Sequence, residues 1–158
     1  MTDESAGEVT WTLESGPREL DEGAARRALA AALEHGGLPG LRVDLVFVDD
    51  AKLAELHGSF LGDPSTTDVI TFDLRDGGVD VTGGADGEIY VSVDRAREVA
   101  KERAIDVAGE LALYVVHGAL HLVGFDDRDP DDRARMRSAE AQVMGRLGIA
   151  VEADGDAF

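Results

Sequence analysis

The segment HGALHLVGFDD contains two histidines and two aspartates whose types and spacing suit metal binding. His117 and His121 are four residues apart, so on a helix both side chains leave one face about one turn apart. Two neutral imidazoles placed in this way can share one ion. Gly124 permits a left-handed turn after the helix, which would bring Asp126 or Asp127 back toward the ion. Two imidazoles, one carboxylate and an open coordination position are typical of a catalytic site rather than a structural one.

The same residues also have an ordinary structural interpretation. Two histidines at this spacing on an apolar helix can be hydrogen-bonded core residues, and the two aspartates can cap the helix that begins at DPDD. The sequence has 4 histidines and no cysteine, so a bound transition metal must use imidazole and carboxylate ligands. We predict a metal site formed by His117, His121 and Asp127, with the structural interpretation as its alternative.

A glycine follows the first histidine, and this residue bears on the class of hydrolase. The spacing matches the zincin pattern H-E-x-x-H-x-x-G-x-x-H, in which the glutamate takes a proton from the metal-bound water. Gly118 replaces that glutamate, so a peptidase of this design would lack its general base. We interpret the glycine as leaving open space beside the ion for a bulky group such as a phosphodiester. The ion itself can polarise a phosphoryl oxygen and acidify its own water.

The hydrophobic pattern predicts an α+β fold. Alternating or β-branched apolar runs predict four strands, at residues 8–14, 41–50, 68–74 and 88–94. Runs with helical spacing predict five helices, at residues 22–35, 51–61, 95–104, 107–124 and 129–148. In this order they indicate a small mixed sheet of about four strands packed against helices. The run 107–124 is apolar on most sides, so we expect a buried central helix that carries the metal ligands.

Length and composition limit the organisation of the chain. Its 158 residues predict one domain at residues 1–150, a metal-dependent hydrolase domain, followed by a flexible acidic tail at residues 151–158. No apolar run approaches the about 18 residues of a membrane span, and the start MTDESAGEV has no secretory pattern. We therefore expect a cytoplasmic protein with no membrane partner.

The charge of the chain opposes direct coating of nucleic acid. Its net charge is -18, from 33 acidic and 15 basic residues, whereas proteins that bind phosphates usually present a basic face. The arginines bunch in the two runs RAREVAKER and RARMR. Solvated helix faces explain these runs better than an RNA track does. The acidity fits a solubility strategy in an acidic or salt-adapted proteome, or partners other than nucleic acid.

The site segment resembles a known family. HGALHLVGFDD is similar to the signature H-G-x-L-H-L-x-G-Y-D-H of the YbeY family of bacterial metal-dependent endoribonucleases, and TTDVITF resembles that family's T-D-V-L-S-F block. The similarity extends over roughly residues 41–147 and includes GEIYVSVD, which resembles the family's G-D-I strand. The resemblance implies a cytoplasmic enzyme with one zinc ion per chain. It also implies maturation of ribosomal RNA, at the 3′ end of small-subunit 16S RNA, and a part in ribosome quality control.

The resemblance also implies roles for individual residues and partners. His117, His121 and Asp127 would hold the zinc ion that activates water for cleavage of single-stranded RNA, with no side-chain base assigned. Thr67 and Asp68 would contact the substrate, although ordinary turn chemistry at the start of a strand explains them equally well. The implied partners are ribosomal RNA and the small ribosomal subunit. Basic ribosomal proteins would help to recruit so acidic a chain.

Two departures from the family pattern affect this interpretation. Asp127 occupies the position of the family's third histidine, and a hard carboxylate loosens selectivity for zinc, so another divalent metal also fits. The family's aromatic-arginine pair is Phe60 and Leu61 here, which removes a cation able to bind a substrate phosphate. One alternative is therefore a non-catalytic ribosome-assembly factor with a structural metal. The other is a zincin-like peptidase, which Gly118 disfavours.

Overall fold

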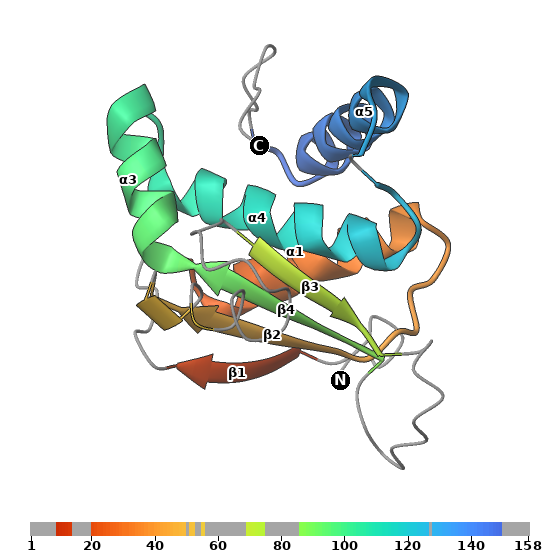
Figure 1. The fold of residues 1–158 in the computed structure, drawn as a ribbon, viewed down its shortest axis with the longest axis horizontal. Helices are drawn as coiled ribbons and strands as arrows, with labels where there is room; N and C mark the ends of the chain where they lie inside the picture. The colour runs from red at the N-terminus through yellow and green to blue at the C-terminus, as the bar shows by residue number, and fades with distance from the viewer. Residues whose placement is uncertain are drawn as a thin grey trace.

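The computed structural model describes residues 9–13, 20–49, 51–52, 55, 69–74, 86–126 and 128–149. These residues contain the strands β1 (Val9–Leu13), β2 (Val43–Val48), β3 (Val69–Asp73) and β4 (Gly87–Ser92). They also contain the helices α1 (Glu22–His35), α3 (Val93–Arg103), α4 (Val107–Leu122) and α5 (Pro130–Arg146) (Figure 1). Of the helix predicted at 51–61, the described residues 51, 52 and 55 are helical. The tail predicted at 151–158 lies outside the described residues.

The sheet is mixed, as the sequence predicts. Its strand order is β1-β2-β4-β3, with β1, β2 and β4 parallel and β3 antiparallel to β4. In the register of the two central strands Leu45 lies opposite Ile89, and Ile89 lies opposite Thr71 of the edge strand β3. Because side chains alternate across a strand, Leu45 and Ile89 face the same side of the sheet. Both are fully buried, which identifies this side as the one covered by helices.

The helix α4 is the centre of the molecule. Every residue from Glu110 to Leu120 is buried, and α4 contacts the helices α1, α3 and α5 and the strands β3 and β4. Figure 1 shows α1 and α4 over one face of the sheet and α5 on the side of α4 that faces away from it. The buried central helix and the α+β architecture predicted from the sequence are both confirmed.

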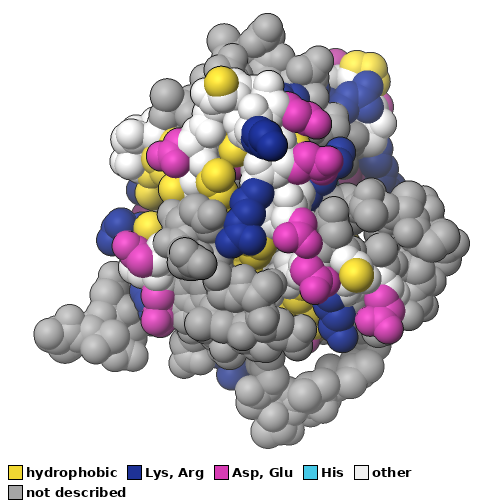
Figure 2. Space-filling view, turned by 90° about the vertical axis from the view of Figure 1, so that its left-hand side faces the viewer, with side chains coloured by type: hydrophobic (Ala, Val, Ile, Leu, Met, Phe, Trp, Pro, Cys, Tyr) yellow, Lys and Arg dark blue, Asp and Glu magenta, His cyan; other side chains and the backbone are white. Residues whose placement is uncertain are grey.

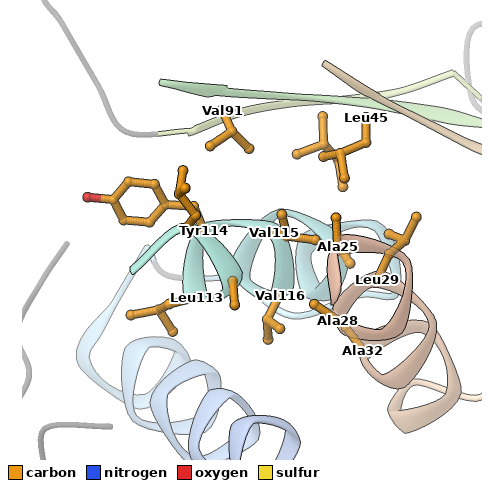
Figure 3. Close-up of a cluster of buried hydrophobic side chains, with 14 of the residues drawn as sticks. Ala25, Ala28, Leu29, Ala32, Leu45, Val91, Leu113, Tyr114, Val115 and Val116 are labelled. Atoms are coloured by element: carbon orange, nitrogen blue, oxygen red, sulfur yellow. The ribbon is translucent and has the colours of Figure 1, made fainter. Parts of the chain in front are cut away.

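Small side chains allow α1 to lie close to α4. The inner face of α1 carries Ala25, Ala28 and Ala32, each at most 1% exposed. In Figure 3 these alanines lie beside Val115 and Val116 of α4, below the sheet residues that complete the core. An amphipathic helix whose apolar side is mostly alanine can approach its neighbour without leaving cavities. Among the described residues, no helix has both the length and the apolar character needed to span a membrane.

The end of α3 provides a test of backbone strain in this fold. Its C-cap residue Ala104 has φ 56° and ψ 45°, in the left-handed region that glycine adopts more easily than alanine. We expect Ala104→Gly to stabilise the protein by about 0.5–1 kcal/mol in urea unfolding. Ala141→Gly is the matched control, because Ala141 is exposed on α5 and glycine in a helix costs about 1 kcal/mol. Destabilisation by both substitutions would contradict the assigned backbone conformation at Ala104.

Candidate metal centre

The two histidines predicted as ligands meet on one face of α4. The Nε2 atoms of His117 and His121 are 3.2 Å apart, and their rings lie edge to face with centroids 4.7 Å apart and an interplanar angle of 81°. His117 is 6% exposed, whereas His121 is half-buried. The pair therefore extends from the core to the surface, with its two Nε2 atoms turned toward each other.

The distance between these nitrogens suits a shared ion. A tetrahedral zinc with Zn–N bonds of about 2.0–2.1 Å separates two nitrogen ligands by about 3.3–3.4 Å. The observed 3.2 Å is close to that value. Two imidazole lone pairs that face each other at this distance repel, so a proton or a cation must lie between them. The geometry of His117 and His121 thus fits half of a tetrahedral metal site.

A buried glutamate from another helix binds the other side of His117. Glu140 of α5 lies with its Oε2 atom 2.5 Å from His117 Nδ1, and it is 5% exposed. Because a carboxylate accepts hydrogen bonds, Nδ1–H is the donor, and the lone pair of Nε2 is directed toward His121. Histidines that bind metals usually donate their second ring N–H to such a carboxylate or to a carbonyl.

Sequence reasoning missed Glu140, although the sequence contains a signal for it. Glu140 follows Met136 by four residues and precedes Val143 by three, so it lies on the apolar face of α5. Met136 and Val143 are both buried in the core. A charged residue on such a face is rare and needs a partner. That signal predicts a buried polar interaction, but it does not say which residue is the partner.

The turn after α4 has the conformation predicted from its glycine. Gly124 has φ 108°, its N–H donates to the His121 carbonyl at 3.2 Å, and Phe125 N–H donates to the Leu120 carbonyl at 3.0 Å. These two bonds form a Schellman motif. Phe125 packs against the core, and its ring centroid lies 5.9 Å from that of His35 at the end of α1. The chain is therefore turned back and held directly after the second histidine.

Of the two carboxylates that follow this turn, only Asp126 lies among the described residues. Asp126 Oδ2 lies 3.2 Å from Arg128 Nε in an ion pair. Asp127, the predicted third ligand, lies outside the described residues, so its role stays a prediction. Within the described ranges, no group of three histidine, aspartate or glutamate side chains could hold a metal ion. His117 and His121 are the part of the predicted centre that these ranges contain.

The interpretation of Gly118 as open space is wrong. A Cβ atom at this position would lie 2.7 Å from Ile89 Cγ2, 3.1 Å from Thr71 Oγ1 and 3.2 Å from Val69 Cγ1. The Thr71 hydroxyl also donates a hydrogen bond to the Gly118 carbonyl at 3.4 Å. The sheet fills the space beside this glycine, and the missing side chain lets α4 lie against β3 and β4. A glutamate in this place would collide with the sheet, which opposes a zincin-like arrangement.

The residues predicted to contact substrate lie outside the described residues. Thr67 and Asp68 precede β3, and the aromatic-leucine pair Phe60 and Leu61 is also outside. The first residue of β3, Val69, is one of the three side chains beside Gly118. The strand that follows Thr67 and Asp68 in the sequence therefore starts next to the helix that carries both histidines.

The outer face of the sheet contains an aromatic pair that is separate from this centre. Tyr90 and Phe72 pack edge to face with centroids 5.8 Å apart, and the Tyr90 hydroxyl donates to Glu88 Oε1 at 3.3 Å. Burial raises the pKa of Tyr90 above its ordinary value, and the nearby Glu88 carboxylate raises it further. Side chains alternate across β4, so Tyr90 points away from the side that Ile89 shares with Gly118. It is not a candidate base for the metal centre.

One arginine in each of the two arginine-rich runs forms an ion pair with an acid on its own helix. Arg95 Nη1 lies 3.0 Å from Glu98 Oε1 on α3, and Arg135 pairs with Asp132 on α5. Figure 2 shows basic and acidic side chains interspersed over the face it presents. These observations favour solvated helix faces, as predicted, over a continuous basic track for RNA.

Comparison with known proteins extends the resemblance along the chain. The family model described as "Endoribonuclease YbeY" matches residues 12–148, a wider range than the two motif blocks cover. A protein of this name from Salinibacter ruber is 37% identical over 134 residues, which cover 82% of this chain and 85% of the relative. Another from Bacillus licheniformis is 33% identical over 128 residues, covering 76% of this chain and 80% of the relative.

The fold is also similar to a solved structure. The solution structure of TM1509 from Thermotoga maritima matches with a TM-score of 0.59 and 24% sequence identity, over 94% of this chain and 99% of that one. At this identity the match supports the fold. The architecture of a small mixed sheet covered by helices is therefore found in both proteins.

Gly118 supplies a test of the contact between α4 and the sheet. We expect Gly118→Ala to destabilise the protein by about 1–2 kcal/mol, since overpacking against Ile89 outweighs the gain of about 1 kcal/mol in helix propensity. Gly145→Ala is the matched control, because nothing lies within 4 Å of a Cβ at that exposed α5 position. It should be stabilising. Equal stabilisation by both substitutions in urea unfolding would show that α4 is not held tightly against the sheet at Gly118.

Proposed function

This chain belongs to the YbeY endoribonuclease family, and from that premise we propose that it is a metal-dependent endoribonuclease acting on ribosomal RNA. The enzyme class predicted from the sequence is confirmed by this membership. The proposed substrate is single-stranded RNA at the 3′ end of small-subunit 16S RNA. The proposal extends to a part in ribosome quality control.

The proposed cofactor is one zinc ion per chain, held by His117, His121 and Asp127, or another divalent metal given the carboxylate. The observation that carries this proposal is the 3.2 Å separation of the two Nε2 atoms, which suits adjacent ligands of one ion. When bound, such an ion supplies Lewis acidity toward a phosphoryl oxygen and lowers the pKa of a water molecule. Glu140 leaves Nε2 of His117 available for this task.

The chain's own residues define the rest of the proposed site. Gly118 packs against the sheet, so we assign no side-chain base at that position. His121, the more exposed of the two histidines, marks the side from which a phosphodiester would approach. Thr67 and Asp68 are the proposed substrate contacts, because the strand that follows them begins beside α4.

The acidic surface shapes the proposal for partners and location. A net charge of -18 makes strong binding to free RNA unfavourable, since phosphates and carboxylates repel. We propose that basic ribosomal proteins of the small subunit bring the enzyme to its RNA, and that it acts in the cytoplasm. Electrostatic attraction to basic proteins would bring the acidic enzyme to the ribosomal subunit, whereas the RNA alone would repel it.

A non-catalytic assembly factor with a structural metal is the second candidate. The observation that favours it is Leu61 at the position of the family's arginine, since a phosphate-binding cation is then missing. This candidate predicts ribosome binding without cleavage. A zincin-like peptidase is opposed both by family membership and by the contact of Gly118 with the sheet.

Metal content tests the proposed ligands. We expect about one zinc per chain by elemental mass spectrometry in the wild type, and a sharp loss in Asp127→Ala, because removal of one of three protein ligands weakens the site. Asp126→Ala is the matched control and should keep its metal, since Asp126 pairs with Arg128. The reverse pattern would assign the third ligand to Asp126. Absence of metal from the wild type after incubation with zinc would refute the proposed centre.

Cleavage assays test the proposed reaction and its recruitment. End-labelled precursor of 16S RNA, given free or within small-subunit particles, should be cut by the wild type, and the particles should be cut faster. We expect His117→Ala to lose at least about 100-fold in rate, as a loss of several kcal/mol of charge stabilisation implies. The exposed variant Gln142→Ala should keep wild-type activity. Equal cutting by His117→Ala would indicate a contaminating nuclease, and binding to particles without cleavage would support the assembly factor.

A further inference from the structure

We propose that Glu140 is a positioning residue for the metal centre, which orients the imidazole of His117 and presents its Nε2 atom to the ion. This inference rests on the proposed metal-dependent function. It assigns a role to a residue of α5 that neither the metal-ligand spacing nor the predicted ligand set includes. Glu140 acts through His117 and does not itself contact the ion or the substrate.

The contact between Glu140 and His117 determines two properties of the imidazole at once. An imidazole can turn about its side-chain bond, and its single proton can sit on either nitrogen. The bond of 2.5 Å between Nδ1 and Glu140 Oε2 fixes the orientation of the ring. It also places the proton on Nδ1, because the carboxylate accepts. Nε2 is then the available ligand atom, 3.2 Å from its counterpart on His121.

Packing alone does not explain a carboxylate at this position. Glu140 is 5% exposed on a helix face whose neighbours Met136, Ala139, Val143 and Met144 are at most 2% exposed. A buried carboxylate is unfavourable unless it is paired, and apolar residues of similar volume often replace such pairs without loss of stability. Among the described residues, His117 is the partner of Glu140. A carboxylate at this position is therefore better explained by its hydrogen bond with His117 than by the packing of the core.

The helix α5 holds this carboxylate in a fixed place relative to α4. At its start, Asp129 caps the helix by accepting from the Asp132 N–H at 2.8 Å. At its end, Arg146 Nη2 lies 2.9 Å from Glu34 Oε1 of α1. Between these points α5 packs on α4 through its buried face. A carboxylate mounted on a docked helix can orient a ring on its neighbour with little freedom for either group.

The proposal predicts a graded loss of zinc affinity. Glu140→Gln keeps the shape and an acceptor oxygen but loses the charge that strengthens the imidazole as a ligand, so zinc should bind about tenfold more weakly. Glu140→Met fills the same space and removes the acceptor, so the loss should approach about 100-fold. Glu102→Gln is the matched control. Glu102 is exposed on α3, and its variant should bind zinc as the wild type does.

Zinc affinity would be measured on the full chain by competition with a chromophoric chelator, with circular dichroism to verify that each variant is folded. A second measurement is independent of metal. In the metal-free protein, long-range 1H–15N correlation should show the proton of His117 on Nδ1 in the wild type. In Glu140→Met the proton should redistribute toward Nε2. A residue that served only the packing of α5 would not change this signal while the fold is intact.

The outcomes separate this inference from the proposed function. Equal zinc affinity in the wild type, Glu140→Gln and Glu140→Met would overturn the positioning role and leave the metal centre in place. An unchanged proton on Nδ1 in Glu140→Met would overturn it as well. Failure of the wild type to bind zinc would overturn both proposals. The isosteric Glu140→Gln variant keeps the test valid should the methionine variant fold poorly.

Discussion

A buried polar group on the central helix is the constraint on which this structure depends. The helix α4 is covered from Glu110 to Leu120, yet it carries His117 in the middle of that stretch. An imidazole in such surroundings needs hydrogen-bond partners for both ring nitrogens. His121 supplies one neighbour from the same helix, and Glu140 supplies the other from α5. The docking of α5 and the chemistry of α4 are therefore parts of one arrangement.

Close packing surrounds α4 on the sides that face the sheet and α1. The sheet approaches at Gly118, where a methyl group would collide with Ile89. The helix α1 approaches through alanines, as Figure 3 shows for Ala25, Ala28 and Ala32. Close contact of this kind transmits small displacements, since a well-packed interior has little free volume. A displacement of the sheet beside Gly118 would thus shift the adjacent residue His117.

The sequence predicted the parts of the site that depend on local spacing. The helix, the shared face of His117 and His121, and the left-handed turn at Gly124 all follow from residues within one turn of each other, and the structure contains each of them. The mixed sheet was predicted from its strands, but not the insertion of β4 between β2 and β3. That order results from long-range pairing, which strand patterns alone do not specify.

Two features of the site could not be predicted because they depend on contacts with elements that are distant in the sequence. Glu140 is 23 residues from His117 in the sequence, and its position on the apolar face of α5 signals only that some partner exists. Gly118 was interpreted as open space for a substrate group, whereas the sheet fills that space, and the reason is the same. A glycine can mark space for a ligand or space taken by a neighbouring backbone, and only the position of β3 and β4 distinguishes these cases.

The acidity of the chain has opposite effects on the two partners of the proposed reaction. A net charge of -18 attracts a divalent cation and repels an RNA backbone, and both effects weaken as salt screens the surface. The buried surroundings of His117 and Glu140 are screened far less than the surface is. Changes in ionic strength should therefore affect the approach of RNA much more than the buried interaction between Glu140 and His117. In the reaction we propose, a basic partner would therefore provide the contact with the substrate, and the buried core of the chain would hold the first metal ligand in place.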